Sequence, residues 1–150
     1  MRARIFTVGH SDRKAGELLG LLQAVAVDCV VDIRSHPVST RHPQFSQPAL
    51  REFLDQQGIR YHWAGRQLGG RQEQFPEFAD YMQTGQFKVS AMQLVNLAGK
   101  NTLCLLCAER QPARCHRSLI ADFLLLQGVQ VVHLIEKGIS QQHTYQQSFT

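Results

Sequence analysis

The sequence of 150 residues contains no apolar run that approaches the roughly 18 residues needed to cross a membrane. The apolar part of its N-terminus is too short for a secretory signal peptide. Compositionally biased tracts and internal repeats are also missing. These absences exclude transmembrane, fibrous and disordered classes, and they predict a cytoplasmic globular protein with no membrane partner.

Cysteine is sparse as well, with four residues in the chain. In a cytoplasmic protein these are expected to be reduced, metal-bound or catalytic rather than a disulfide framework. The sequence has neither a Walker phosphate loop nor the glycine fingerprint of dinucleotide-binding proteins. No cofactor is therefore predicted from the sequence.

Charge is more informative, because the formal net charge is +4 and twelve of the sixteen basic residues are arginine. The planar guanidinium group favours bidentate partners such as phosphate or carboxylate. The sequence predicts an anionic ligand, which could be a nucleotide or a nucleic acid. A generally solvated basic surface would have the same composition.

Apolar runs alternate with segments of helical periodicity along the chain. We expect strands over residues 4–10, 28–34, 59–63, 102–107 and 129–135, with helices or irregular loops between them. This alternation predicts an α/β three-layer sandwich with a mostly parallel, five-stranded, Rossmann-like sheet. Residues 1–150 form one domain in this interpretation, with a loosely ordered tail over 139–150 and a flexible glycine-rich loop over 65–71.

Ligands of such folds bind beyond the carboxyl ends of the strands. The strand end with the most reactive and charged side chains covers residues 107–117, which hold two thiols, one carboxylate, one imidazole and three guanidiniums. Cys115 is the first candidate nucleophile, because a helix N-terminus and nearby arginines favour its thiolate, and Cys107 is the second. Glu109 is a candidate acid or base. A structural role for both cysteines stays open.

The ends of two earlier predicted strands also carry polar side chains. Asp32 and Arg34 lie two apart on a strand end, so they share a face and act either on one ligand or on each other. His10 and Ser11 follow the first strand, where a plain helix cap is the alternative. The catalytic candidates are therefore Cys115, Cys107, Glu109, Asp32 and His10, and the substrate-binding candidates are Ser11, Arg34, Arg41, Arg71, Arg114, His116 and Arg117.

A zinc site built on Cys104 and Cys107 is disfavoured, because residues three apart on a strand point to opposite faces. Cys104 is expected in the core. A site made of Cys107, Cys115, His116 and an acid stays open, but no metal ligand is assigned.

The chain resembles the domain-of-unknown-function family 488 in five motifs, which read T-V-G-H-S, V-D-I-R-S-H-P, P-Q-F, Q-L-G-G-R and C-A-E-R-x-P-x-R-C-H-R-S-L-I-A-D. The similarity extends from about residue 7 to about residue 133. It implies a compact α/β fold and a shared polar pocket, but no activity. His42 stands where members of the family often have asparagine before the proline.

Two functions are compatible with these residues. The first is an enzyme acting on a phosphate-containing substrate, a nucleotide or nucleic acid, through a thiol or a carboxylate. The second is a non-catalytic module that binds nucleic acid or a nucleotide with the same arginines. The convergence of thiols, carboxylates and an imidazole favours the enzyme, because phosphate binding alone needs only cations.

Overall fold

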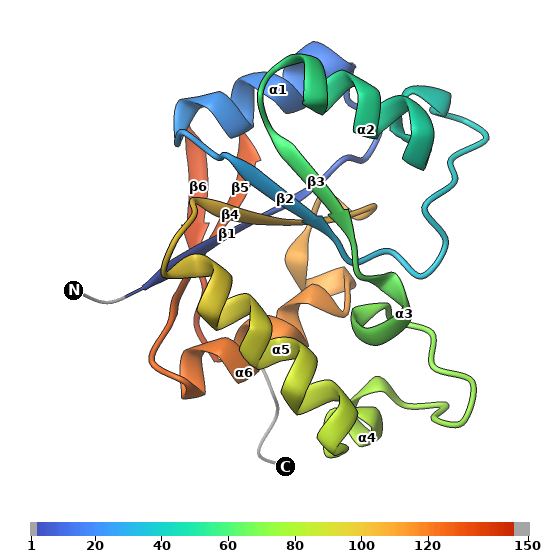
Figure 1. Ribbon diagram of the computed structural model, residues 1–150, viewed down its shortest axis with the longest axis vertical. Coiled ribbons are helices and arrows are strands. Elements are labelled where there is room, and N and C mark those ends of the chain that lie inside the picture. The colour runs from blue at the N-terminus through green and yellow to red at the C-terminus, as the bar shows by residue number, and fades with distance from the viewer. Residues whose placement is uncertain (1–2, 146–150) are drawn as a thin grey trace.

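The computed structural model describes residues 3–145 as one sheet with helices on both faces (Figure 1). Five of its strands are parallel: β1 (Arg4–Gly9), β2 (Cys29–Asp32), β3 (Arg60–Trp63), β4 (Leu103–Cys107) and β5 (Gln130–Glu136). The sixth, β6 (Ile139–Gln142), is antiparallel to β5. The strand order is β3-β2-β4-β1-β5-β6. This confirms the predicted α/β sandwich with a mostly parallel sheet.

The predicted count of five strands is wrong, because part of the expected tail is the sixth strand. Ser140 pairs with Leu134 across the β5–β6 ladder, and His143 beyond the strand is buried. All four residues of β6 are exposed, so this edge strand lacks the apolar pattern by which a strand is recognised. The expectation of a loose tail therefore fails for 139–145, while 146–150 lie outside the described residues.

Helices pack on the two faces of the sheet and create two separate cores. Figure 1 shows α1 (Ala15–Ala24) and α2 (Gln47–Gln56) above the sheet, and α5 (Gly85–Ala98) and α6 (Arg117–Leu126) below it. The upper core joins Leu18 and Leu50 to Leu106. The lower core joins Phe87 and Ile120 to Leu105.

Strand β4 is buried along its whole length, which explains its unbroken apolar sequence. Its side chains alternate between the two cores, with Cys104 in the upper core and Cys107 in the lower. The two thiols therefore lie on opposite faces of the sheet. This is the separation that the strand period predicts.

The glycine-rich stretch after β3 is more ordered than expected. It contains α3 (Gly65–Leu68), which leads toward the short helix α4 (Phe78–Tyr81) beside α5 (Figure 1). A Cβ at Gly65 would lie 1.9 Å from the carbonyl oxygen of Arg34, so only glycine permits this close approach of two loops. Within residues 3–145, no helix combines the length and the hydropathy that a membrane span requires.

Candidate functional site

A pocket of about 470 Å³ lies at the carboxyl ends of the parallel strands. Four loops contribute to its wall: His10 follows β1, Arg34 follows β2, Arg71 lies in the connection after β3, and Cys107 ends β4. The loops after β1 and β4 lead to helices on opposite faces of the sheet, and such a topological switch point is where ligands of these folds bind. The pocket thus occupies the place where the sequence predicts chemistry.

The exits of β1 and β4 are held against one another by backbone hydrogen bonds. The amide of His10 donates to the carbonyl of Cys107 over 2.9 Å, and the amide of Ser11 donates to the carbonyl of Ala108 over 2.9 Å. A Cβ at Gly9 would lie 1.7 Å from the carbonyl oxygen of Glu109. Glycine at this position therefore permits the contact that brings the two loops together.

Asp32 and Arg34 act on each other, which was one of the two alternatives that the sequence left open. Arg34 donates from Nε to Asp32 Oδ1 over 2.9 Å and from Nη2 to Oδ2 over 2.7 Å. The hydroxyl of Tyr61 also donates to Asp32, which is fully buried. Asp32 therefore has no access to the pocket, and its effect on a ligand is to hold the guanidinium of Arg34 in place.

The guanidinium of Arg34 keeps one donor free. Its Nη1 is buried and has no hydrogen-bond partner among the described residues, while the Arg34 side chain is 5% exposed. Arg34 lines the pocket. Because an unpaired buried donor is costly, this nitrogen marks a position where an acceptor from a ligand would fit.

Cys107 lies beside a buried cation. Arg117 is 0% exposed, and its Nη1 donates to Cys107 Sγ and to the carbonyl of Glu109. Burial alone would raise the pKa of the Cys107 thiol, but a hydrogen bond from the Cys115 thiol and the charge of Arg117 outweigh it and lower the pKa to about 7. Cys107 is thus partly thiolate at neutral pH.

Cys115 has the opposite tendency, which corrects the expected order of the two thiols. Its hydrogen bond to Cys107 and its burial raise the pKa of the Cys115 thiol. The helix begins at Arg117 rather than at Cys115, and the first-turn amide of Arg117 donates to Cys115 Sγ over 3.4 Å. The predicted order differs because the Arg117 side chain folds back onto Cys107, a contact that local periodicity does not show.

His116 is fixed in one tautomer by its neighbours. Its Nε2 lies 2.8 Å from the carbonyl oxygen of Leu68, which can only accept a hydrogen bond, so Nε2 carries the proton. Its Nδ1 is then free to accept, and it lies 3.5 Å from Cys115 Sγ. Burial lowers the pKa of His116. The imidazole is therefore neutral at pH 7, and the lone pair of its Nδ1 lies beside Cys115 Sγ.

His10 is also held neutral. Burial lowers its pKa to about 4, against a raising contribution from the hydrogen bond to the Ser11 carbonyl. Its Nδ1 lies 2.9 Å from that carbonyl oxygen, and the ring packs on Phe45 with 4.7 Å between ring centroids. Because the carbonyl fixes the proton on Nδ1, the Nε2 of His10 is unprotonated.

Eight of the twelve candidate residues line the pocket: His10, Arg34, Arg71, Cys107, Glu109, Arg114, Cys115 and His116. The four that do not are Ser11, Asp32, Arg41 and Arg117. Arg117 is a buried partner of Cys107 rather than the expected anion ligand.

Two residues of the loop after β2 were not predicted as site residues, although Arg34 of the same loop was. These residues, Ser35 and His36, also line the pocket, and the hydroxyl oxygen of Ser35 accepts a hydrogen bond from the amide of Arg71 over 2.9 Å. The V-D-I-R-S-H-P motif, which runs through both residues, was the available signal.

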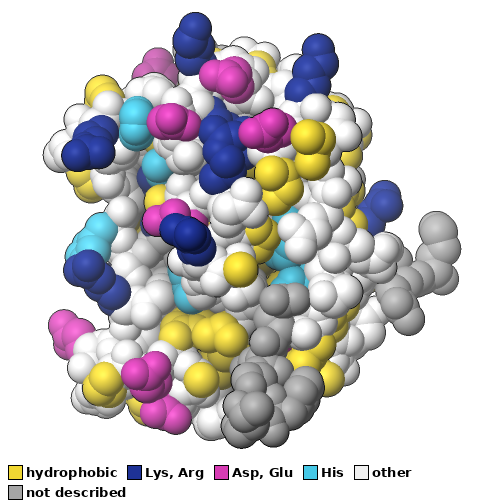
Figure 2. All heavy atoms as spheres, turned by 180° about the vertical axis from the view of Figure 1, so that it is seen from behind, with side chains coloured by type: hydrophobic (Ala, Val, Ile, Leu, Met, Phe, Trp, Pro, Cys, Tyr) yellow, Lys and Arg dark blue, Asp and Glu magenta, His cyan; other side chains and the backbone are white. Residues whose placement is uncertain are grey.

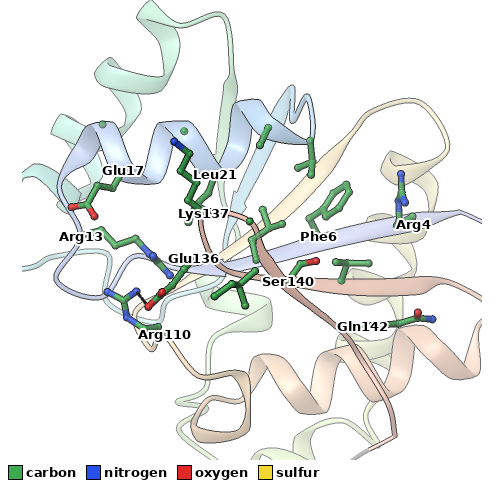
Figure 3. Close-up of a pocket in the computed structure, with 18 residues that line it drawn as sticks. Arg4, Phe6, Arg13, Glu17, Leu21, Arg110, Glu136, Lys137, Ser140 and Gln142 are labelled. Carbon is green, nitrogen blue, oxygen red and sulfur yellow. Dashed lines mark hydrogen bonds and ion pairs between the residues drawn. The ribbon is translucent and has the colours of Figure 1, made fainter.

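A larger cavity of about 1280 Å³ lies between α1 and the β5–β6 hairpin (Figure 3). Its floor is apolar, and Arg110 and Glu136 form an ion pair of 3.4 Å at its rim. No cysteine or histidine of the described chain lines it, so the reactive side chains belong to the smaller pocket. Among residues 3–145, no three His, Cys, Asp or Glu side chains gather closely enough to hold a metal ion.

Comparison with known proteins matches the chain to a protein family. The sequence profile of the family described as "Domain of unknown function DUF488" matches residues 14–124. Neither the curated proteins nor the solved structures that were compared contain a match to the chain.

Proposed function

The chain belongs to the DUF488 family, whose description assigns no activity, and from its pocket we propose that it is an enzyme that uses the Cys107 thiolate on a phosphate-containing substrate. One observation carries the proposal. The same small pocket is lined by the thiol that Arg117 contacts and by Arg34, whose Nη1 has no partner among the described residues. A nucleophile and a fixed anion ligand are the two parts that such a reaction requires.

Charge around the pocket supports an anionic substrate. Arg71 and Arg114 line it with exposed side chains, and Arg34 lines it with a buried one. Of the described lining residues, only Glu109 carries a carboxylate. Three guanidiniums facing one carboxylate favour a ligand whose oxygens accept several hydrogen bonds, as those of a phosphate do.

The residues present can carry out transfer of the phosphoryl group. Cys107 Sγ attacks phosphorus, the bond to the leaving oxygen breaks, and that oxygen takes a proton from a nearby acid. His10, with an unprotonated Nε2, is the candidate base that then takes a proton from the water or hydroxyl that attacks the thiophosphoryl group and releases Cys107. Glu109 is the other candidate acid or base. We also propose a cytoplasmic location, because reducing conditions keep the thiol available.

A non-catalytic module that binds nucleic acid or a nucleotide is the second candidate function. Figure 2 shows basic side chains standing apart and interspersed with carboxylates on the face it presents. Single-stranded nucleic acid binds along a continuous positive groove with aromatic platforms. On this face the mixed charges therefore favour a compact phosphate compound over a long strand.

Alkylation with iodoacetamide tests the proposal, with each cysteine followed by mass spectrometry across pH. We expect Cys107 to react with an inflection near pH 7 and to be protected by inorganic phosphate, a nucleotide or short DNA. Arg34→Lys keeps a charge beside Asp32 but lacks the second guanidinium nitrogen, so protection should be lost. The matched control Arg41→Lys changes an exposed arginine outside the pocket and should leave protection intact.

Catalysis and binding are separated by a second variant. An enzyme requires Cys107→Ser to abolish turnover of a phosphorylated compound while its affinity stays within a few-fold. If the protein is a binding module, Cys107→Ser should leave the affinity unchanged and the arginine substitutions should lower it. The affinity should also fall steeply with salt. If no phosphate compound protects Cys107 in the wild-type protein, the proposed function is wrong.

A further inference from the structure

The pocket contains a pair of thiols rather than a single one. Cys107 ends β4, and Cys115 follows the 3-10 helix Pro112–Arg114. Both line the pocket, and the Cys115 thiol is hydrogen-bonded to Cys107. The two other cysteines, Cys29 and Cys104, are free and buried. Arg117 also contacts both sulfur atoms, Cys107 Sγ through its guanidinium and Cys115 Sγ through its backbone amide. Two thiols gathered around one residue in the wall of one pocket are an arrangement from which a disulfide can form.

The environments of the two thiols differ in the way that a two-step oxidation needs. Cys107 receives a hydrogen bond from the guanidinium of Arg117, which favours its thiolate. Cys115 keeps its proton, and its sulfur lies 3.5 Å from the unprotonated Nδ1 of His116. One thiol is thus prepared to attack first, and the other has a base beside it for the second step.

We propose that this pocket reduces hydroperoxides, with Cys107 as the sulfur that is oxidised and Cys115 as the sulfur that resolves it into an intramolecular disulfide. Cys107 Sγ attacks the terminal oxygen of the peroxide, the O–O bond breaks, and the leaving oxygen takes a proton to become an alcohol or water. Cys107 is now a sulfenic acid. The peroxide has been reduced by two electrons.

Closure of the disulfide uses His116. Its Nδ1 takes the proton of Cys115, whose sulfur attacks Cys107 Sγ. The S–O bond breaks, and the hydroxide that leaves recovers the proton as water. Two thiols and one hydroperoxide yield one disulfide, one alcohol and one water. A small-molecule dithiol returns the pair to its reduced form by exchange.

This activity shares Cys107 with the proposed function but does not require the phosphate site. The disulfide would remove the thiolate and thereby inactivate any phosphate chemistry at Cys107. The pocket admits a peroxide because Cys107, although 2% exposed, lies in its wall.

The test is stoichiometric oxidation of the full-length protein by hydrogen peroxide, followed by peptide mapping without reduction. We expect loss of two thiols, a mass lower by two hydrogens, and a Cys107–Cys115 linked peptide that dithiothreitol removes. Cys115→Ser should stop at a sulfenic acid on Cys107 that dimedone traps. Cys29→Ser is the matched control and should form the same disulfide, because Cys29 lies outside the pocket.

His116→Gln tests the base directly. The first oxidation of Cys107 should keep its rate, whereas disulfide closure should slow by on the order of 100-fold. Equal rates of closure in His116→Gln and wild type would overturn the role of His116. A sulfenic or sulfinic acid that accumulates on wild-type Cys107 without a disulfide would overturn the whole proposal.

The Arg34→Lys variant separates this proposal from the proposed function. It should lose protection by phosphate and still form the disulfide. If the wild-type protein forms the disulfide but phosphate does not protect Cys107, only the proposed phosphate-containing substrate is refuted. If phosphate protects Cys107 but no disulfide forms, only the proposed reduction of peroxides is refuted.

Discussion

Arg117→Met should raise the pKa of Cys107 by removing the buried charge that holds its thiolate. The guanidinium of Arg117 contacts Cys107 Sγ and is 0% exposed, so water does not screen the interaction. Methionine has a similar length and no charge. The desolvation of Cys107 that opposes ionisation stays in the variant, while both contributions of Arg117 disappear.

The hydrogen bond from Cys115 and the two contributions of Arg117 together outweigh burial and lower the pKa of Cys107 from its ordinary value of 9.0 to about 7. Without Arg117, burial is opposed mainly by the Cys115 hydrogen bond, and we expect the pKa to return to about 9. A return to about 9 lowers the thiolate fraction at pH 7 from about one half to about 1%. The more basic thiolate is roughly 6- to 10-fold more nucleophilic. The rate of alkylation at pH 7 should therefore fall by about 5- to 8-fold.

The measurement is the pH profile of iodoacetamide modification at Cys107, whose inflection should move up by about two units. Arg13→Met is the matched control, because Arg13 is also buried and donates to backbone carbonyls, but does not contact Cys107. Cys104 reports folding in every sample, since a folded core leaves it unmodified. An inflection that stays near 7 in Arg117→Met, with Cys104 unmodified, would refute the assigned cause.

Two further predictions concern stability, measured as the free energy of unfolding in urea. Gly9→Ala should cost about 3 kcal/mol or more, because the new Cβ meets the Glu109 carbonyl oxygen; Gly20→Ala, with nothing within 4 Å, should gain about 0.5–1 kcal/mol. Equal effects would contradict the close approach. Burial lowers the pKa of His10 to about 4 and of His133 to about 3. As the pH falls, the two histidines take up protons in the unfolded chain before they do so in the folded protein. The free energy of unfolding should therefore fall below pH 6.5, by about 2 kcal/mol per histidine at pH 5. An unfolding midpoint unchanged between pH 7 and pH 5 would exclude this linkage.

The sheet could be predicted because its strands carry their burial in their own sequence. β4 reads as an unbroken apolar run and is buried at every residue. β6 has no such signal, because its side chains are exposed and its place depends on the backbone of β5. No sequence pattern indicates that His143 is buried either, yet it lies 2.8 Å from both His133 and Asp122.

The location of the pocket was predictable from the sequence, whereas the contacts of its side chains were less so. Cys107, Arg34 and His10 follow strands that are evident in the sequence, and parallel strands bring their carboxyl ends to one edge. The assignment of the lower pKa to Cys115 was not confirmed, because the guanidinium of Arg117 contacts Cys107 instead. That assignment depended on where a helix begins, and helix boundaries are the least certain part of a periodic pattern.

The sequence by itself determined the alternation of strands and helices, the edge of the sheet where reactive side chains gather, and the separation of Cys104 from Cys107. These follow from local periodicity and from the handedness of crossovers between parallel strands. Only the tertiary structure decided that Arg117 contacts Cys107, that Nη1 of Arg34 has no partner among the described residues, and that Asp32 is paired with Arg34. These depend on side chains that meet across loops, because burial removes water and lets one buried contact decide the state of each group.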